Sequence, residues 1–245
     1  MSPMSKVASH GILAGALLAL MACGSRASEA DANPPRNLES LRDFTSVTLA
    51  GPDRVVVTRG AQFSVRAEGD PRALARLEID VRDGVLRIRR KHNWRDILPG
   101  EDRGATVNVT LPVLHEVALA GSGDISADVL SGDDVEASVS GSGDLTIARV
   151  EAAKAGLSAT GSGTLTATGG RADRAELSVA GSGDIKAGGL VATAAEISIA
   201  GSGDAQAYVS GAARISIVGS GDAVVTGTTQ CSVSRIGSGS ARCTA

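Results

Sequence analysis

One tripeptide recurs along the second half of the chain at a nearly constant interval, and this regularity restricts the possible folds more than any other feature. Gly-Ser-Gly begins at residues 121, 141, 161, 181, 201, 219 and 237. The interval is constant over the first five copies and is shortened by two positions for each of the last two. Periods of this size are typical of solenoid proteins, in which each repeat forms one coil and buries its apolar side against its neighbours.

The residues around each tripeptide alternate between apolar and polar types. Two positions before it lie Leu119, Val139, Ala159, Val179, Ile199, Ile217 and Arg235. Three positions before it stands a serine in most copies: Ser138, Ser158, Ser178, Ser198, Ser216 and Ser234. A period of two indicates strands with one buried face, whereas glycines at fixed positions would break helices.

These patterns predict an all-β fold, a single-stranded β-helix or β-solenoid with coils of about 18–20 residues. The 245 residues include only one Trp, one Tyr and two Phe, so the core must be narrow and aliphatic. The scarcity of aromatic side chains and the net charge of −3 also disfavour nucleic-acid binding, which depends on base stacking and cationic surfaces.

Residues 41–115 are less regular but still contain alternating segments. The dipeptide Asp83-Gly84 separates two of these segments and indicates a β-hairpin. Residues 71–77 fit a short helix. We expect residues 41–115 to form irregular N-terminal coils and a cap for the repeats at 116–245, so that 41–245 is a single solenoid domain.

The N-terminal segment, residues 1–22, has the layout of a secretory signal, because Lys6 precedes an apolar run over residues 11–22. The run ends at Cys23 and resembles a bacterial lipobox, which predicts that Cys23 is lipidated. The polar residues 23–40 would then form a flexible tether. Because no aspartate follows the cysteine, the resemblance implies a lipoprotein of the outer membrane, facing the periplasm or the outside. The alternative is an ordinary signal peptide with an incidental cysteine.

The order of the motifs resembles that of one protein family. The Asp83-Gly84 hairpin is followed by Val-Asn-Val-Thr-Leu-Pro at 107–112, and then by repeats that open with Val-Ala-Leu-Ala-Gly-Ser-Gly-Asp at 117–124. This order is similar to that of the auto-transporter adhesin, head GIN domain family, over about residues 41–243. The resemblance implies a right-handed β-helix-like fold and a secreted or surface-exposed bacterial protein. It suggests adhesion and supplies no catalytic residues.

Two cysteines other than Cys23 lie in the last coil. Cys231 and Cys243 stand six residues before and six residues after Gly237, on the side of the strands that we expect to be buried. Outside the cytoplasm such a pair forms a disulfide, which would pin the end of the solenoid. The alternative is two buried free thiols.

The position after the tripeptide is an aspartate in five copies: Asp124, Asp144, Asp184, Asp204 and Asp222. Stacked coils would bring these like charges into one column, where they repel each other. One explanation is that each carboxylate accepts hydrogen bonds from N–H groups of its own turn. The other is a ladder of bound calcium ions, which prefer carboxylate and carbonyl oxygens. We expect no other cofactor.

One charged stretch stands outside the repeats and contains the only tryptophan. Its candidate site residues are Arg87, Arg89, Arg90, Lys91, Trp94 and Arg95. They could form a solvated hairpin arm, or a patch that binds an anionic partner such as a lipid phosphate, an acidic polysaccharide or a neighbouring subunit.

We interpret the chain as a non-enzymatic, lipid-anchored envelope protein that acts as an adhesin-like binding or scaffold module. The polar walls of a solenoid suit repetitive ligands such as polysaccharides, and envelope or surface proteins are further candidate partners. One alternative is a purely structural or self-associating envelope protein without a soluble ligand. Another is a polysaccharide-cleaving β-helix enzyme that uses the aspartate column. Because the repeat already accounts for these aspartates, we assign no catalytic residue.

Overall fold

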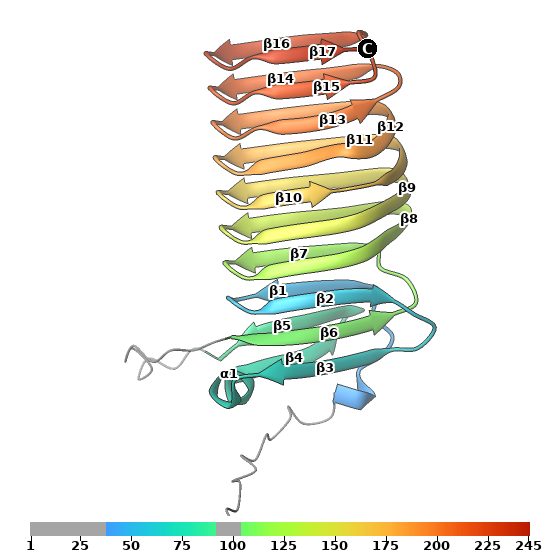
Figure 1. Cartoon of the computed structure of the whole chain (residues 1–245), viewed down its shortest axis with the longest axis vertical. Helices are drawn as coiled ribbons and strands as arrows, with labels where there is room; N and C mark the ends of the chain where they lie inside the picture. Colours follow the sequence, from blue (N-terminus) through green and yellow to red (C-terminus); the bar gives the residue numbers. More distant parts are fainter. Residues whose placement is uncertain (1–37, 92–103) are drawn as a thin grey trace, which may run out of the picture. The chain divides into compact units, whose positions relative to one another are not determined.

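The computed structural model describes residues 38–91 and 104–245, which belong to the compact unit Asn33–Ala245. These residues form a stack of β-coils, so the predicted all-β solenoid is confirmed (Figure 1). The predicted signal segment 1–22, Cys23 and the tether up to residue 37 lie outside the described residues. The described helical segments are η1 (Leu38–Ser40) and α1 (Pro71–Arg76), and neither is long and apolar enough to cross a membrane.

Each coil of the repeats consists of two strand segments that run in opposite directions and are joined by a tight corner and a wider corner. The tight corner is Gly-Ser-Gly. Long strands such as β8 continue around the wide corner. The strands of this region are β7 (Glu116–Gly121), β8 (Asp124–Gly141), β9 (Asp144–Gly161), β10 (Thr164–Ala167), β11 (Gly170–Gly181), β12 (Asp184–Gly201), β13 (Ala205–Val209), β14 (Ala213–Gly219), β15 (Ala223–Thr226), β16 (Cys231–Gly237) and β17 (Ala241–Thr244).

Successive coils pair in parallel, and the register equals the period of the sequence. Strands β8 and β9 align each residue with the one 20 positions later, from Asp124 with Asp144 onward. Strands β12 and β14 align Ala195 with Ala213, an offset of 18. Between β12 and β13 the register shifts after Ala187. The two residues missing from the shorter coils are therefore lost at the wide corner, while the tight corner keeps its geometry.

Inside the coils, aliphatic side chains lie above one another in columns and are almost completely excluded from solvent. The residues two positions before the tight corner are about 1% exposed from Leu119 to Ile217. After the corner, the inward residues change from Ile125 and Leu145 to Ala205 and Ala223, all at most 1% exposed. The narrow aliphatic core predicted from the composition is confirmed in the repeats.

The two glycines of each tight corner have different functions. The first glycine has a positive φ, for example +126° at Gly141, which side chains other than glycine rarely adopt. The second approaches the preceding coil so closely that a Cβ atom on Gly203 would lie 1.9 Å from the carbonyl oxygen of Gly183. Positive φ at the first position and close backbone approach at the second therefore both favour glycine at these corners.

The N-terminal coils do not stack in the order of the chain. Strand β1 (Ser46–Ala50) lies between β5 (Val85–Arg90) and β7, and pairs with both in parallel. Strand β2 (Arg54–Arg59) lies in the same way between β6 (Ala105–Leu111) and β8. The coil of β1 and β2 is therefore enclosed between a coil that follows it in sequence and the first repeat.

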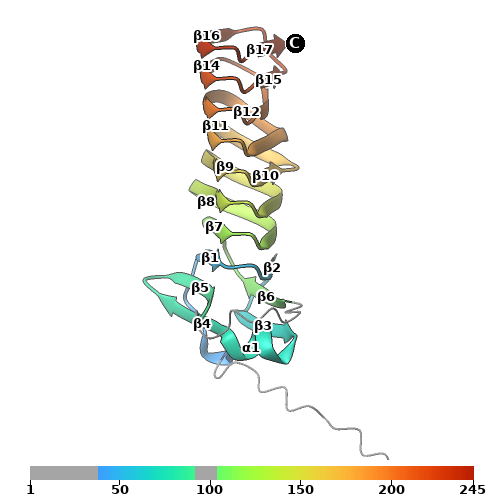
Figure 2. The same cartoon turned by 90° about the vertical axis from the view of Figure 1, so that its left-hand side faces the viewer.

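Two reversed strands close this end of the stack. Strand β3 (Ser64–Gly69) pairs antiparallel with β6, and β4 (Leu77–Arg82) pairs antiparallel with β5. Helix α1 connects them; the Asp70 side chain accepts a hydrogen bond from the Arg72 N–H at its start, and Pro71 occupies the first turn. Figure 2 shows these elements at the end opposite the C-terminus. The antiparallel strands β3 and β4, helix α1 and the tilted ring pair Phe44–Phe63 therefore cover this end of the core.

Candidate functional site

The strands that end at a tight corner present a column of serines on their outer surface, which we call the serine face. These side chains are partly or fully exposed: Ser138, Ser158, Ser178, Ser198, Ser216 and Ser234. The register aligns Ser178 with Ser158 on one side and with Ser198 on the other. Because neighbouring strands lie about 4.8 Å apart, the serines recur at a regular interval from coil to coil.

Charged side chains flank the serine row on the same face. Glu136, Glu176 and Glu196 lie two positions before the serines of their coils. The Glu176 carboxylate lies 3.1 Å from the Lys154 Nζ atom, and its hydrogen bond and negative charge raise the pKa of Lys154. The serine face therefore offers regularly repeated hydrogen-bond donors and acceptors along the stack.

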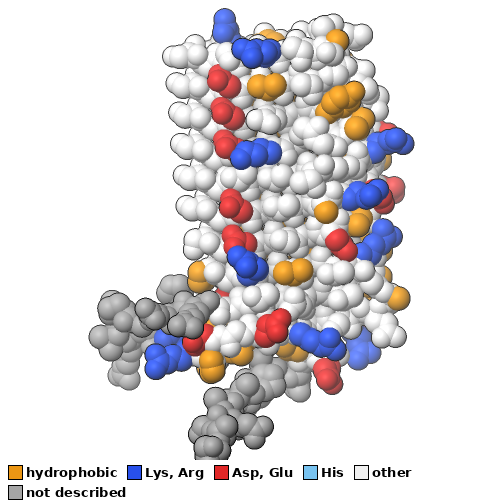
Figure 3. Space-filling model, in the orientation of Figure 1, with side chains coloured by type: hydrophobic (Ala, Val, Ile, Leu, Met, Phe, Trp, Pro, Cys, Tyr) orange, Lys and Arg blue, Asp and Glu red, His pale blue; other side chains and the backbone are white. Residues whose placement is uncertain are grey.

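The strands that begin after a tight corner carry the aspartates, and we call their outer surface the aspartate face. Figure 3 shows the acidic side chains aligned along the stack. Oδ1 atoms of the column accept hydrogen bonds from backbone N–H groups one coil further on: Asp144 from Thr164 at 3.3 Å, Asp184 from Asp204 at 3.1 Å, and Asp204 from Asp222 at 2.9 Å. The carboxylates do accept from the backbone, but the donor belongs to the next coil and not to their own turn as expected.

The two ends of the aspartate column have additional partners. Asp124 lies 3.1 Å from the Arg54 guanidinium. Asp222 accepts from the Ser240 N–H at 2.8 Å and from the Ser240 hydroxyl at 2.9 Å, and these two hydrogen bonds lower the pKa of Asp222. A general acid for glycoside cleavage needs a raised pKa. The pKa of Asp222 is lowered instead.

A calcium ladder along this column stays a prediction. Within residues 38–91 and 104–245, no three His, Cys, Asp or Glu side chains are grouped closely enough to hold a metal ion. In several of these aspartates, one carboxylate oxygen already accepts a hydrogen bond from a backbone N–H group of the next coil. Hydrogen bonds between coils therefore account for part of the aspartate column.

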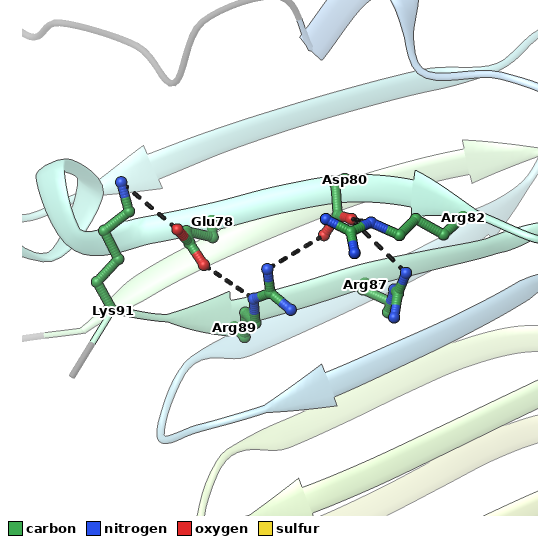
Figure 4. A network of polar contacts seen from close by, with 6 residues as sticks. All are labelled: Glu78, Asp80, Arg82, Arg87, Arg89 and Lys91. Atoms are coloured by element: carbon green, nitrogen blue, oxygen red, sulfur yellow. Dashed lines mark hydrogen bonds and ion pairs between the residues drawn. The ribbon is translucent and has the colours of Figure 1, made fainter.

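The basic stretch is mostly paired within its own hairpin. Arg89 Nε donates to Glu78 at 2.8 Å, which lowers the pKa of Glu78, and Lys91 Nζ lies 3.4 Å from the same carboxylate. Arg87 lies 3.8 Å from Asp80. Figure 4 shows this network on β4 and β5. Trp94 and Arg95 lie outside the described residues. The binding of an anionic partner here stays a prediction, and the described cations of the hairpin already have acidic neighbours.

Arg90 does not belong to an exposed patch, which corrects its assignment from the sequence. Its side chain is 12% exposed and forms two hydrogen bonds with Asp53, whose carboxylate is fully buried. The Ala105 N–H donates to the same carboxylate at 2.8 Å. Alternation along β5 turns Arg90 inward, whereas Arg87 and Arg89 point outward.

The sequence analysis did not identify Asp53 as a buried partner of Arg90, although its position relative to the repeats indicates a corner residue. The segment Val47–Gly51 has the same pattern as Val117–Gly121, and Asp53 stands where the repeats have their second corner glycine. Its carbonyl accepts from the Asp124 N–H at 3.0 Å, as a corner residue does. This alignment identifies β1 and β2 as a coil whose tight corner carries a buried charge.

Cys231 and Cys243 form a disulfide, as predicted from their positions. The bond connects β16 with β17 across the interior of the last coil. Beyond this coil the structure describes no further strand (Figure 1). The disulfide is therefore located at an end of the core that lacks the reversed strands of the other end.

Comparison with known proteins gives one family and a set of related folds. The sequence matches the family model described as "Putative auto-transporter adhesin, head GIN domain" over residues 43–229. No curated protein matches the chain. Solved structures that resemble it have low sequence identity to the chain and therefore show the fold alone.

Three of these structures cover 84% of this chain. A putative adhesin from Bacteroides fragilis has a TM-score of 0.74 at 22% identity and is covered over 94% of its own length. A protein from Parabacteroides distasonis named as a putative lipid binding protein has a TM-score of 0.67 at 24% identity and 94% coverage. A putative adhesin from Parabacteroides merdae has a TM-score of 0.63 at 22% identity and 93% coverage.

Proposed function

Because the chain belongs to the family described as putative auto-transporter adhesin, head GIN domain, we propose that it is a non-enzymatic, adhesin-like binding or scaffold module of the bacterial cell envelope. The observation that supports this function is the serine face, on which the same hydroxyl position recurs from coil to coil. The solved structures named as adhesins are consistent with such a role.

An extended polymer with repeating hydroxyl groups suits this surface, because Glu136, Glu176 and Glu196 on the same face would repel repeated carboxylates. A row of serines spaced by about 4.8 Å offers many weak hydrogen bonds along a line. Each bond contributes little in water, but several made by one polymer chain add their effects. Polysaccharides have this chemistry, and we therefore propose them as the ligand class.

We further propose that Cys23 is lipidated and holds the protein at the outer membrane. The lipobox resemblance supports this anchor, and the polar residues 24–37 would separate it from the solenoid. Cells grown with an alkyne-bearing fatty acid should label the wild-type chain and should not label the Cys23→Ala variant. Label that persists in this variant would contradict lipidation at Cys23.

Binding is tested with the chain from residue 24 onward, which contains the compact unit Asn33–Ala245. The oxidised protein is incubated with acidic and neutral polysaccharides, and its retention on the polysaccharide is measured. The same samples are assayed for new ends of the polysaccharide chains, which would report cleavage. Replacing Ser178 and Ser198 by glutamate should reduce retention at least tenfold. The same charge change at Thr146 and Thr166, on the aspartate face, should leave retention unchanged.

The outcomes separate the three functions under consideration. Retention without new chain ends supports the binding module. New chain ends would show a polysaccharide-cleaving enzyme and contradict the proposal. If no polysaccharide is retained, the purely structural role is favoured, and the proposed ligand class is rejected. Equal losses in both pairs of variants would place the binding surface elsewhere than on the serine face.

A further inference from the structure

A hollow lies at the wide-corner end of the serine face, on the successive strands β11, β12, β14 and β16 (Figure 1). Its volume of about 470 Å³ is within the range of small-molecule sites. Ala194 aligns with Arg174 of the preceding coil, and Ala212 stands at the same repeat position one coil further on. Because both alanine side chains are short, the surface is recessed between the longer side chains around them.

Three charged side chains line this hollow, namely Arg174, Glu196 and Arg214. In the column two positions before the serines, the register places Arg214 beside Glu196, so the column changes from negative to positive at this point. Two arginines and one glutamate give the lining a formal charge of +1. The hollow therefore attracts a singly charged anion more strongly than a neutral molecule of the same size.

The charged groups of the hollow are not in direct contact with one another. One coil earlier, Lys154 and Glu176 form an ion pair at 3.1 Å. Arg174 and Glu196 stand at the same two repeat positions. Like Arg214, they form no ion pair or side-chain hydrogen bond with any other residue that the structure describes. A ligand can therefore contact these three side chains without breaking an interaction within the protein.

We propose that this hollow is a subsite for an acidic sugar unit, of the hexuronic acid class, in the polysaccharide that the serine face binds. The guanidinium groups of Arg174 and Arg214 bind the carboxylate, because their planar arrangement of donors matches its two oxygens. The Glu196 carboxylate accepts hydrogen bonds from the sugar hydroxyl groups. The Gln230 amide, which also lines the hollow, both donates and accepts hydrogen bonds.

A hexuronate fits this lining better than other anions because the lining contains an acid as well as two cations. A phosphate group carries a charge of about −1.5 to −2 at neutral pH, so Glu196 repels it more strongly than it repels a single carboxylate. A small carboxylate without hydroxyl groups offers no donor to Glu196. The glutamates elsewhere on the serine face disfavour a carboxylate in every unit, so we expect acidic units at intervals along the polymer.

This inference rests on the proposed polysaccharide binding, but a monosaccharide tests the subsite separately. The oxidised chain from residue 24 onward is titrated with glucuronate and galacturonate, and with glucose as the neutral control, while its amide NMR signals are recorded. Both uronates should shift the signals of residues 194–196, 212–214 and 229–232, and glucose should not.

Two matched pairs of variants test the charge and the shape of the hollow. Arg214→Ala should weaken uronate binding about tenfold or more, the loss expected when a charge-assisted hydrogen bond is removed. Lys154→Ala removes a cation from the repeat position of Arg174 outside the hollow and should bind uronate as the wild type does. Ala212→Leu fills the hollow at constant charge and should also lose binding about tenfold. Ala200→Leu, at an exposed position of β12 outside the hollow, should not.

A further variant tests the match of charge between the lining and the ligand. Glu196→Gln keeps a hydrogen-bonding side chain and removes the negative charge. It should therefore bind inorganic phosphate about threefold more tightly than the wild type does. If the wild type binds inorganic phosphate or acetate at least as tightly as glucuronate, the assignment to a hexuronate is wrong.

The subsite itself is rejected if neither uronate shifts the signals of the hollow, or if Arg214→Ala and Lys154→Ala bind uronate equally. Retention on polysaccharides is measured separately with the same protein. Retention without uronate binding would reject the subsite and leave the proposed function in place. Uronate binding in the hollow without retention on any polysaccharide would support the subsite and reject the polymer as the ligand.

Discussion

The two ends of this solenoid complete the same kind of core by different means. At the N-terminal end the chain reverses direction, places β3 and β4 against β6 and β5, and adds the buried pair of Asp53 and Arg90. In the last described coil, the Cys231–Cys243 disulfide joins β16 and β17. The first arrangement pairs the edges of a coil with reversed strands, whereas the second links the two strands of one coil by a covalent bond.

This difference teaches that a β-solenoid end has two separate requirements. The apolar core must be shielded from water, and the strand edges must be kept from pairing with other chains. Reversed strands shield the core at the N-terminal end, where Phe44 is fully buried. In the last described coils the inward residue after the corner is a small one, Ala223 and then Ala241, and the Cys231–Cys243 disulfide joins the two strands of the last coil covalently.

The largest effect is expected from breaking the buried pair at the N-terminal end. Asp53→Ala leaves the nearly buried Arg90 without its carboxylate and the Ala105 N–H without its acceptor. Removing one member of a buried pair costs about 3–5 kcal/mol. Urea unfolding should show this loss in the free energy of unfolding.

The control for this change is an exposed pair one coil away. Asp124→Ala removes the partner of Arg54, and the two side chains are 62% exposed at Arg54 and 44% exposed at Asp124. Exposed ion pairs contribute less than about 1 kcal/mol. If the two variants lose equal stability, burial is not what makes the Asp53 pair important.

The next largest effect concerns the disulfide. Replacing both Cys231 and Cys243 by serine should cost about 2–4 kcal/mol, because the unfolded segment is no longer constrained. Amide hydrogen exchange should become faster in β16 and β17, while β1 and β2 should keep their protection. Faster exchange at both ends would show that the two ends are not independent.

A third change acts on the coils between the ends. Gly203→Ala would place a Cβ atom 1.9 Å from the Gly183 carbonyl oxygen, so the coils must separate. Overpacking of this kind costs about 1–3 kcal/mol. Thermal melting measures the loss. Gly188→Ala, whose Cβ has no atom within 4 Å, should melt as the wild type does.

The smallest effect is expected at the last aspartate of the column. Hydrogen bonds from Ser240 lower the pKa of Asp222 below its ordinary value of 3.8 in the folded protein. The resulting stabilisation is present above pH 3.8 and is lost as the pH falls through the lowered pKa. NMR titration of the Ser240→Ala variant should show this pKa moving back toward 3.8. An unchanged titration would exclude the hydroxyl as a cause of the shift.

The repeats could be predicted closely from the sequence because their neighbours in space are fixed by the period. The constant interval between the tripeptides places Ser158 beside Ser138 and Ser178, and the structure has this register. The same regularity placed Cys231 and Cys243 inward in one coil, and their disulfide is confirmed. Local alternation and a fixed period were sufficient for these features.

The N-terminal half could not be predicted in this detail because its contacts join segments that are far apart in the chain. Nothing in local alternation shows that β1 lies between β5 and β7, or that Arg90 reaches Asp53, which is 37 residues away. From the sequence alone, the stretch from Arg87 to Lys91 predicts an exposed cationic patch. Only the placement of β5 beside β4 and β1 shows which of its charges point outward and which acids neutralise them.

The sequence by itself therefore determined the solenoid, its corners, its inward columns and its disulfide, since each depends on residues at a fixed spacing. The tertiary structure decided the order in which the N-terminal coils stack and the burial of the charge at Asp53. It also decided which backbone N–H groups donate to the aspartate column. The physical reason is that hydrogen bonding between coils and burial of charge depend on which strands become neighbours, and long-range pairing selects those neighbours.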